Sequence, residues 1–306
     1  MELRAMKAFV EVVREGGFSR AAKRLHLTQS TVSKAVKQLE DEFGLPLLDR
    51  AGHHNRLTGA GKLVYAKALA ILTQGDDLQA ELRELRGLKT GNLRLGLPAI
   101  GSNTLFARWF ALYRNRFRGV NIHLVENGSK NLEKMVSSGE LDLAGSLLPV
   151  SGEFDWQAVR REPIDALLPL KHTLASRPQI TFKALAEEPF ILYAPGFALN
   201  PIILAACKES GFAPKVAAES SQVDFIIALV AAQMGVAFVP RMIAEQRPHP
   251  MVKRIPVNHP NIYWHMALIW RRGAFLSEAA KGWLALAGES TDCGAAFAGE
   301  PQNVGK

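Results

Sequence analysis

The sequence predicts an α/β protein in two parts, a small and mostly helical winged helix-turn-helix domain followed by a larger domain of strands and helices. Three observations predict this. The chain has 306 residues, enough for about two domains. Residues 1–58 contain short helical patterns separated by turn signals. From residue 92 onward, short apolar runs alternate with helical patterns, which is typical of a sheet flanked by helices.

The composition excludes several classes of protein. Hydrophobic residues make up 48% and charged residues 22% of the chain, so it is neither disordered nor fibrous. Cys207 and Cys293 are the two cysteines, which cannot build a disulfide framework or a four-thiolate zinc site. The amino terminus resembles an amphipathic helix more than a signal peptide, and the longest apolar stretch, residues 225–240, is too interrupted to span a membrane. We therefore expect a cytoplasmic protein with no membrane contact, no metal and no cofactor.

Turn and cap residues divide the first part into three helices. Gly16 and Gly17 are expected to end the first helix, because glycine accepts the left-handed conformation of a helix terminus. Ser19 is expected to cap the second helix and Thr28 the third, and Gly44 is expected to end the third. Two short helices with a tight turn between them predict a helix-turn-helix over the second and third helices.

The outer face of the third helix carries side chains suited to DNA. The net charge of the chain is +8, which favours a polyanionic partner. Glutamine and serine can bond base edges, while lysine, arginine and hydroxyl groups bond phosphates. A solvated face of an ordinary helical bundle is the alternative. We expect contacts at or near base edges from Gln29, Ser30, Ser33 and Lys34, and phosphate contacts from Arg20, Thr28, Lys37 and Arg50.

A wing and a long helix follow. Residues 45–50 and 56–57 are expected to form a hairpin whose turn carries His53 and His54, which we interpret as wing contacts and not as a metal pair.

Residues 59–89 contain no proline, and their apolar residues repeat every seven positions, which is typical of a helix that packs along a partner. One long helix within a single bundle is the alternative. The repeat consists of Val64, Ala68, Ile71, Gly75, Leu78, Leu82 and Leu85.

The second part alternates strands and helices, which predicts a parallel sheet that binds ligands at the carboxyl ends of its strands. Helix starts favour anions, because their backbone N–H groups are unpaired and carry partial positive charge. Ser102 and Asn103 lie at one such start and Ser129 at another, with a plain helix cap as the alternative for each serine. We expect Asp142 to be a structural partner near a buried strand end. The strands are expected at residues 93–97, 120–125, 141–144, 164–168, 190–193, 236–239 and 265–270.

The first sixty residues resemble the LysR-type transcriptional regulators. The matching segments are residues 18–22 (FSRAA), 25–34 (LHLTQSTVSK), 37–40 (KQLE), 45–50 (LPLLDR) and 57–61 (LTGAG). Looser similarity to the effector-binding domain of that family lies in residues 138–143, 185–193 and 229–240. One departure is Leu48, where the family usually has phenylalanine. We expect that difference to change packing and not function.

The resemblance implies a domain order and a ligand site. Residues 1–58 would form the winged helix-turn-helix domain, 59–89 a dimerisation helix, and 92–306 an effector-binding domain with two lobes, like a periplasmic solute-binding protein. Lobe I would comprise residues 92–163 and 265–288, lobe II residues 164–264, and residues 289–306 a mobile tail. The chain would cross between the lobes near Pro163 and His265. A small organic anion is expected between the lobes, held by Ser102, Asn103, Ser129, Ser146, Tyr193, Pro195 and Gly196.

The resemblance also implies partners. It implies a homodimer, and often a homotetramer, bound to double-stranded DNA at an interrupted palindrome, and it leaves RNA polymerase open as a further partner. Two alternatives stay open: a thiol-redox regulator of the same family that uses Cys207, and an architectural DNA-binding protein without an effector. An enzyme is not expected, because the sequence has no G-x-S-x-G elbow and no H-E-x-x-H motif.

Overall fold

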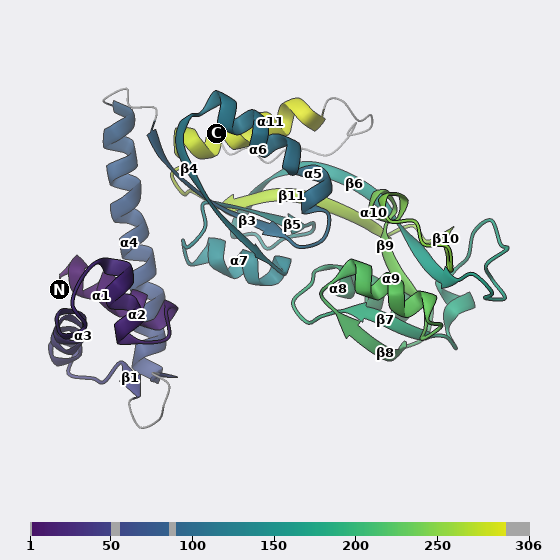
Figure 1. Ribbon diagram of the computed structural model, residues 1–306, viewed down its shortest axis with the longest axis horizontal. Helices are drawn as coiled ribbons and strands as arrows, with labels where there is room; N and C mark the ends of the chain where they lie inside the picture. Colours follow the sequence, from purple (N-terminus) through teal and green to yellow (C-terminus); the bar gives the residue numbers. More distant parts are fainter. Residues whose placement is uncertain (1, 50–55, 86–89, 292–306) are drawn as a thin grey trace. The chain divides into compact units, whose positions relative to one another are not determined.

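A computed structural model describes residues 2–49, 56–85 and 90–291 (Figure 1). Contacts within the chain divide it into two compact units. One unit contains residues 1–88 with 138–140, and the other contains residues 89–137 with 141–306. The long helix that follows the hairpin therefore packs as part of the amino-terminal unit.

The amino-terminal unit is a three-helix bundle followed by a hairpin and a long helix. Its core is formed by apolar side chains of the first three helices, among them the fully buried Phe9, Val36 and Leu39. Ala21 and Ala22 are also buried, and such small side chains allow helices to approach closely. The elements are α1 (Leu3–Arg14), α2 (Phe18–Leu25), α3 (Gln29–Phe43), β1 (Leu48–Asp49), β2 (Arg56–Leu57) and α4 (Gly59–Leu85).

The expected caps of this unit are confirmed except one. Gly16 and Gly44 have φ of +65°, and the Thr28 hydroxyl accepts a hydrogen bond from the Thr31 N–H at 3.2 Å. The prediction for Ser19 is wrong, because α2 begins at Phe18, two residues before the start that a Ser19 cap would give, and the extended Gly17 takes the cap position. His26, with φ of +54°, ends α2 in the left-handed conformation.

The first strand of the hairpin is shorter than expected. The backbone N–H groups of Leu47 and Leu48 donate to the Glu40 carboxylate at 2.8 and 3.2 Å, and so the segment before Leu48 is bound to α3. Leu48 pairs with Leu57 and Asp49 with Arg56 in the two-stranded ladder. Arg50, His53 and His54, expected to contact DNA, lie outside the described residues.

Helix α4 has one face packed on the helix-turn-helix core and apolar side chains exposed elsewhere on its surface. Ala68 and Leu69 are buried against the helix-turn-helix core, and Val64 packs beside them. The first two positions of the predicted seven-residue repeat are therefore covered within this chain. Among the residues of the helix whose side chains are described, the exposed large apolar ones are Leu63, Ile71, Leu78 and Leu82.

The second unit is built on a mixed sheet with the strand order β10-β6-β11-β5-β3-β4. The expectation of a parallel sheet is correct for β3 (Thr90–Pro98) with its neighbours β4 (Gly119–Asn127) and β5 (Leu143–Leu147). It is also correct for β7 (Pro189–Tyr193) and β8 (Lys215–Ser220), which form a separate two-stranded parallel sheet. Strand β11 (Tyr263–Arg271) runs antiparallel to β5 and to β6 (Phe154–Pro169). Strand β11 therefore runs opposite to both of its neighbours, which makes the sheet mixed.

Helices cover both faces of the first lobe. Figure 1 shows α6 (Ala107–Arg116) beside α11 (Glu278–Thr291) on one face and α7 (Ser129–Ser137) on the other. The short α5 (Ser102–Leu105) precedes α6. Trp283 of α11 packs against Trp109 and Tyr113 of α6, with ring centroids 6.2 and 5.3 Å apart. Residues 289–291 of the expected tail belong to α11, and residues 292–306 lie outside the described part of the chain.

The second lobe shares strand β6 with the first. Residues 154–163 of β6 pair with β11, while residues 164–169 pair with β9 (Ala237–Pro240) and β10 (Val252–Pro256). The chain thus passes between lobes at Pro163 within one continuous strand. The other elements of the lobe are η1 (Phe182–Leu185), β7 (Pro189–Tyr193), α8 (Leu199–Glu209), β8 (Lys215–Ser220), α9 (Val223–Ala231) and α10 (Arg241–Gln246).

A buried carboxylate lies on β6 just after this crossing point. Asp165 is fully buried, and Arg241 donates to it through Nε and Nη2, both at 3.0 Å. Arg254 of β10 donates to the same carboxylate at 2.6 Å. Two arginines from different elements are thereby fixed to the strand that joins the lobes.

Candidate functional site

The outer face of α3 is polar and open to solvent. Gln29, Ser30, Lys34 and Lys37 are exposed, and Ser33 is half-buried. Within the described part of the chain, neither lysine has an ion-pair partner. The opposite face of α3 packs into the core of the domain through Val32, Val36 and Leu39. The polar face could therefore contact a partner without any change in those core contacts.

Two of the predicted phosphate contacts precede α3 in the chain, Thr28 as its cap and Arg20 on α2. Thr28 is exposed, but its hydroxyl is engaged with Ser30 and Thr31 at 3.0 and 2.8 Å. The cap of α3 therefore occupies much of the bonding capacity of Thr28. Arg20 projects from α2 and is exposed, and it has no ion-pair partner among the described residues.

In the second unit, two of the predicted ligand segments touch each other across the lobes. The Lys130 N–H of α7 donates to the carbonyl oxygen of Gly196, in the loop after β7, at 3.3 Å. A methyl group added to Gly128 would lie 2.6 Å from the same oxygen. The amino-terminal end of α7 thus binds an oxygen atom from the other lobe.

Ser129 and Ser146 lie behind this contact. Ser129 is 4% exposed at the start of α7. Ser146 of β5 is fully buried, and its hydroxyl donates to Glu133 of α7 at 2.5 Å. Glu133 also accepts from Lys130 at 2.9 Å. The sequence reasoning missed Glu133, because the contact depends on α7 packing over β5.

A second contact joins the lobes through α5. The Thr104 hydroxyl donates to the Gln246 side chain of α10 at 2.7 Å. The buried Ser102 donates to the backbone carbonyl of Pro98, whereas Asn103 is exposed and accepts from the Thr104 N–H at 2.9 Å. Gly101 leaves room for the Trp264 ring, which lies 2.9 Å from the position of a Cβ at Gly101. The start of α5 is therefore next to the other lobe, and its serine is bound to its own strand.

The remaining predicted ligand residues differ in exposure. Tyr193 is buried, and its hydroxyl donates to the Phe238 carbonyl at 2.9 Å within the core of the second lobe. Burial raises the pKa of this phenol well above its ordinary value. Pro195 is exposed and Gly196 is half-buried. Of this loop, the Gly196 backbone is the part that reaches the first lobe.

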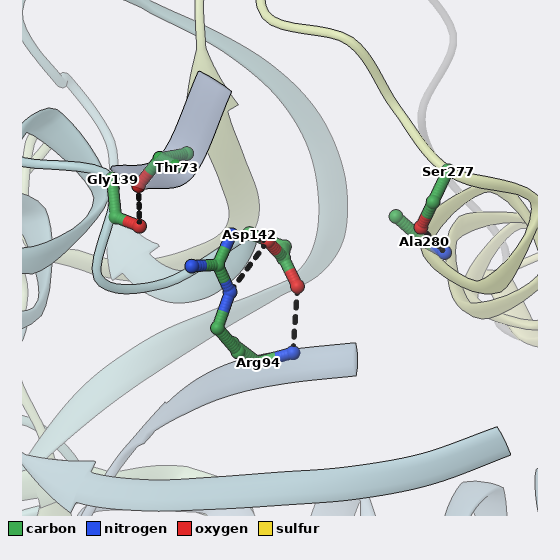
Figure 2. A network of polar contacts seen from close by, with 6 residues as sticks. All are labelled: Thr73, Arg94, Gly139, Asp142, Ser277 and Ala280. Carbon is green, nitrogen blue, oxygen red and sulfur yellow. Dashed lines mark hydrogen bonds and ion pairs between the residues drawn. The ribbon is translucent and has the colours of Figure 1, made fainter. Parts of the chain in front are cut away.

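Asp142 has the structural role expected for it. Its carboxylate accepts from the Arg94 backbone N–H at 2.7 Å and from Arg94 Nε at 2.9 Å (Figure 2). The Asp142 N–H in turn donates to the Arg94 carbonyl at 2.8 Å. These bonds fix the start of β5 to β3, and the prediction is confirmed.

Cys207 is poorly placed for redox chemistry. It is fully buried in α8, and burial raises its pKa to about 11. The thiolate is the form that oxidants attack, and at pH 7 it would be on the order of one molecule in ten thousand. The geometry therefore favours a structural thiol at this position.

Two kinds of feature are absent from the described residues, a membrane-spanning helix and a cluster of metal ligands. No helix there is both long and apolar enough to cross a bilayer. In the same residues, no three histidine, cysteine or acidic side chains gather as metal ligands would.

Comparison with known proteins identifies both units. The model of the bacterial regulatory helix-turn-helix protein, lysR family, matches residues 3–62, and the model of the LysR substrate binding domain matches residues 86–292. The uncharacterized HTH-type transcriptional regulator YwbI of Bacillus subtilis is 34% identical over 285 residues, which are 93% of this chain and 95% of the relative. The transcriptional dual regulator GltC of the same organism is 30% identical, over 92% of this chain and 94% of GltC.

Solved structures agree with these matches. A full-length OxyR variant from Pseudomonas aeruginosa superposes with a TM-score of 0.72 at 25% identity, over 95% of this chain and 94% of the OxyR chain. The family models together cover most of the chain, with the helix-turn-helix and the effector-binding domain in the order found here. The chain therefore belongs to the LysR family of transcriptional regulators, which bind DNA and small-molecule effectors.

Proposed function

We propose that this regulator binds an interrupted palindromic operator as a homodimer and that a small organic anion held between the two lobes controls it. In this proposal residues 1–58 contact DNA, 59–89 dimerise, and 92–306 bind the effector, in lobes I and II divided at Pro163 and His265. The single observation that carries DNA reading is the open polar face of α3, whose lysines lack ion-pair partners in the described residues. The regulator works in the cytoplasm and has no enzymatic activity of its own.

Exposed apolar side chains support the assembly. Ile71, Leu78 and Leu82 lie in solvent on α4, where a second copy of the helix would cover them. Two recognition helices in a dimer would enter major grooves about 34–36 Å apart, or a multiple of that distance. Leu124 on the edge strand β4 and Phe225 on α9 are exposed as well, and they offer a further interface for a homotetramer. RNA polymerase is a further proposed partner of the DNA-bound form.

Operator binding should separate base-reading residues from phosphate contacts. With a duplex selected from a random pool by the unaltered protein, Gln29→Ala is expected to lose about 1–3 kcal/mol at one base position and to relax specificity there. Lys37→Ala is expected to weaken binding to all sequences alike and to reduce the salt slope by about one. Fluorescence anisotropy on operator and scrambled duplexes measures both, and equal effects of the two variants on the two duplexes would contradict the assigned roles.

The effector proposal rests on the start of α7. The Lys130 N–H at this helix start already donates to an oxygen of the other lobe, the Gly196 carbonyl, and an organic carboxylate offers an oxygen acceptor with a full charge. Ser129 lies at this helix start and Ser146 behind it, while Ser102 and Asn103 lie at the second interlobe contact. Gly196 and Pro195 would face the ligand from lobe II through their backbone. Tyr193 would support that loop from within the core.

A thermal-shift screen tests this site. We expect at least one small carboxylate to raise the melting temperature of the unaltered protein. The same compound is expected to leave the melting temperatures of Ser129→Ala and Ser102→Ala unchanged. Ser176→Ala, which removes an exposed hydroxyl from a distant loop, should keep the shift. A ligand that shifts all four proteins equally would leave the effector in place but refute these residues as its site.

A further inference from the structure

Two side chains join the lobes of the effector-binding domain directly, Thr104 of α5 and Gln246 of α10. The Thr104 hydroxyl donates to Gln246 Oε1 at 2.7 Å, across 142 positions of the chain. We call this pair the interlobe latch. In Figure 1 it lies where α5 approaches α10, apart from the point at which the start of α7 meets the loop before α8.

The position of Thr104 on lobe I is fixed by its neighbours. Its backbone N–H donates to Asn103 Oδ1 at 2.9 Å. Gly101, with φ of +87°, packs on the Trp264 ring, and Phe106 is fully buried. Helix α5 is four residues long, so these contacts on either side leave Thr104 little freedom of position.

Gln246 is the last residue of α10, and the first residue of that helix is bound to the strand that crosses between the lobes. Arg241 begins α10 and donates two hydrogen bonds of 3.0 Å to the buried Asp165 of β6. The three residues after Arg241 are buried. Among them, Met242 Cε lies 3.5 Å from the position that a Cβ would take at Gly101. Gln246 is therefore carried by an anchored helix whose start also approaches lobe I.

The interlobe latch is made by protein atoms alone. The second interlobe contact, from the Lys130 N–H to the Gly196 carbonyl at 3.3 Å, has the same property. A ligand that binds between the lobes passes through an open form in which these contacts are broken. The population of that open form therefore sets how often the site is accessible.

We propose that the interlobe latch controls the opening of the cleft and thereby the access of the effector to its site, with Thr104 and Gln246 as positioning residues. The proposal rests on an effector site between the lobes and adds a means of regulation to it. Because the bond involves no ligand atom, it stabilises the closed form with and without effector. It therefore slows effector association and dissociation alike. A hydrogen bond between side chains changes such an equilibrium by about two- to tenfold.

Thiol labelling measures the opening of the cleft in the full chain without any effector. Ser129→Cys places a thiol at the other interlobe contact, where the native serine is 4% exposed, in a chain that also carries Cys293→Ser. The rate of its reaction with N-ethylmaleimide, followed by mass spectrometry, reports how often the cleft opens. Cys207 is the internal control, because this fully buried thiol of lobe II reacts only when that lobe unfolds.

The variants to compare differ by single groups at the latch. Thr104→Val removes the hydroxyl and keeps the shape of the side chain, whereas Thr104→Ser keeps the hydroxyl. Gln246→Leu removes the acceptor, and Gln246→Glu keeps an acceptor oxygen. We expect Thr104→Val and Gln246→Leu each to raise the labelling rate of the Ser129→Cys thiol about two- to tenfold. The two variants that retain the bond should stay near the parent. The double variant should open no more than either single one, because both changes remove the same bond.

Equal labelling rates in Thr104→Val and Thr104→Ser would overturn the proposal. A parallel rise at Cys207 would overturn it as well, since the bond would then stabilise the fold of lobe II and not the closed cleft. None of these measurements depends on an effector. If no small carboxylate raises the melting temperature in the thermal-shift screen, the effector proposal fails while the labelling result stands, and the two failures are thus distinguishable.

Discussion

Replacement of Asp165 by alanine is expected to lower the free energy of unfolding of the effector-binding domain by about 3 kcal/mol. The carboxylate is fully buried and binds Arg241 through two hydrogen bonds and Arg254 through a third. Removal of one partner of a buried ion pair costs about 3–5 kcal/mol, because the other charge is left without compensation. Here we expect the lower end of that range, since both arginine side chains keep more than a third of their surface in water.

Urea denaturation followed by tryptophan fluorescence measures this change. All five tryptophans lie in the second unit, so the signal reports on the effector-binding domain alone. Glu289→Gln is the matched control, because it breaks the exposed ion pair with Arg116 and should leave the denaturation midpoint unchanged. If Asp165→Ala had the same denaturation midpoint as this control, the ion pairs of Asp165 with the two arginines would not stabilise the domain.

Gly61→Ala is expected to destabilise the amino-terminal unit by about 1–3 kcal/mol and to abolish most operator binding at 25 °C. A Cβ at Gly61 would overlap the backbone carbonyl oxygen of Leu47, which also accepts a hydrogen bond from the Thr58 N–H at 3.0 Å. A backbone carbonyl held by a second bond cannot move aside, and overpacking of this kind costs about 1–3 kcal/mol. The gain of up to about 1 kcal/mol in helix propensity offsets part of the cost.

Gly59→Ala is the control for that prediction. Gly59 lies two residues earlier in the same first turn of α4, and a Cβ there would meet no atom within 4 Å. Circular dichroism melts and operator titrations of both variants measure the effect. If the two alanine variants behaved alike, α4 would not dock against the Leu47 carbonyl as the structure has it.

The helix-turn-helix was predictable because its signals are local. Gly16, Thr28 and Gly44 act within one turn of their own positions, so the sequence pattern alone indicates where α1 and α3 end or begin. The prediction that Ser19 caps α2 failed for a local reason as well. An extended glycine can precede a helix without a side-chain cap, and Gly17 occupies the cap position two residues before Ser19.

Strand β6 shows why the second unit was harder to predict. Its first ten residues mix buried with half-buried or exposed positions and include the exposed Arg160 and Arg161, so no apolar run marks them. Their partner strand β11 follows about a hundred residues later in the chain, and its direction sets the antiparallel half of the sheet. Local patterns contain no information on that pairing, which is why a parallel sheet was expected.

In the candidate sites, too, some features follow from local sequence and others from long-range packing. The starts of α5 and α7 were visible in the sequence, as were the cations of α2. The bonds of Thr104 to Gln246 and of Lys130 to Gly196 depend on how the lobes pack, and residues far apart in the chain meet there.

The close approach of Gly128 to the Gly196 carbonyl has a genetic consequence. Any side chain at position 128 would act as a wedge between the lobes, because even a methyl group would lie 2.6 Å from that oxygen. Glycine and alanine codons differ by one base. A single base change could therefore hold the lobes apart with no ligand involved, and position 128 is where selection for inducer-independent or uninducible strains should find mutations.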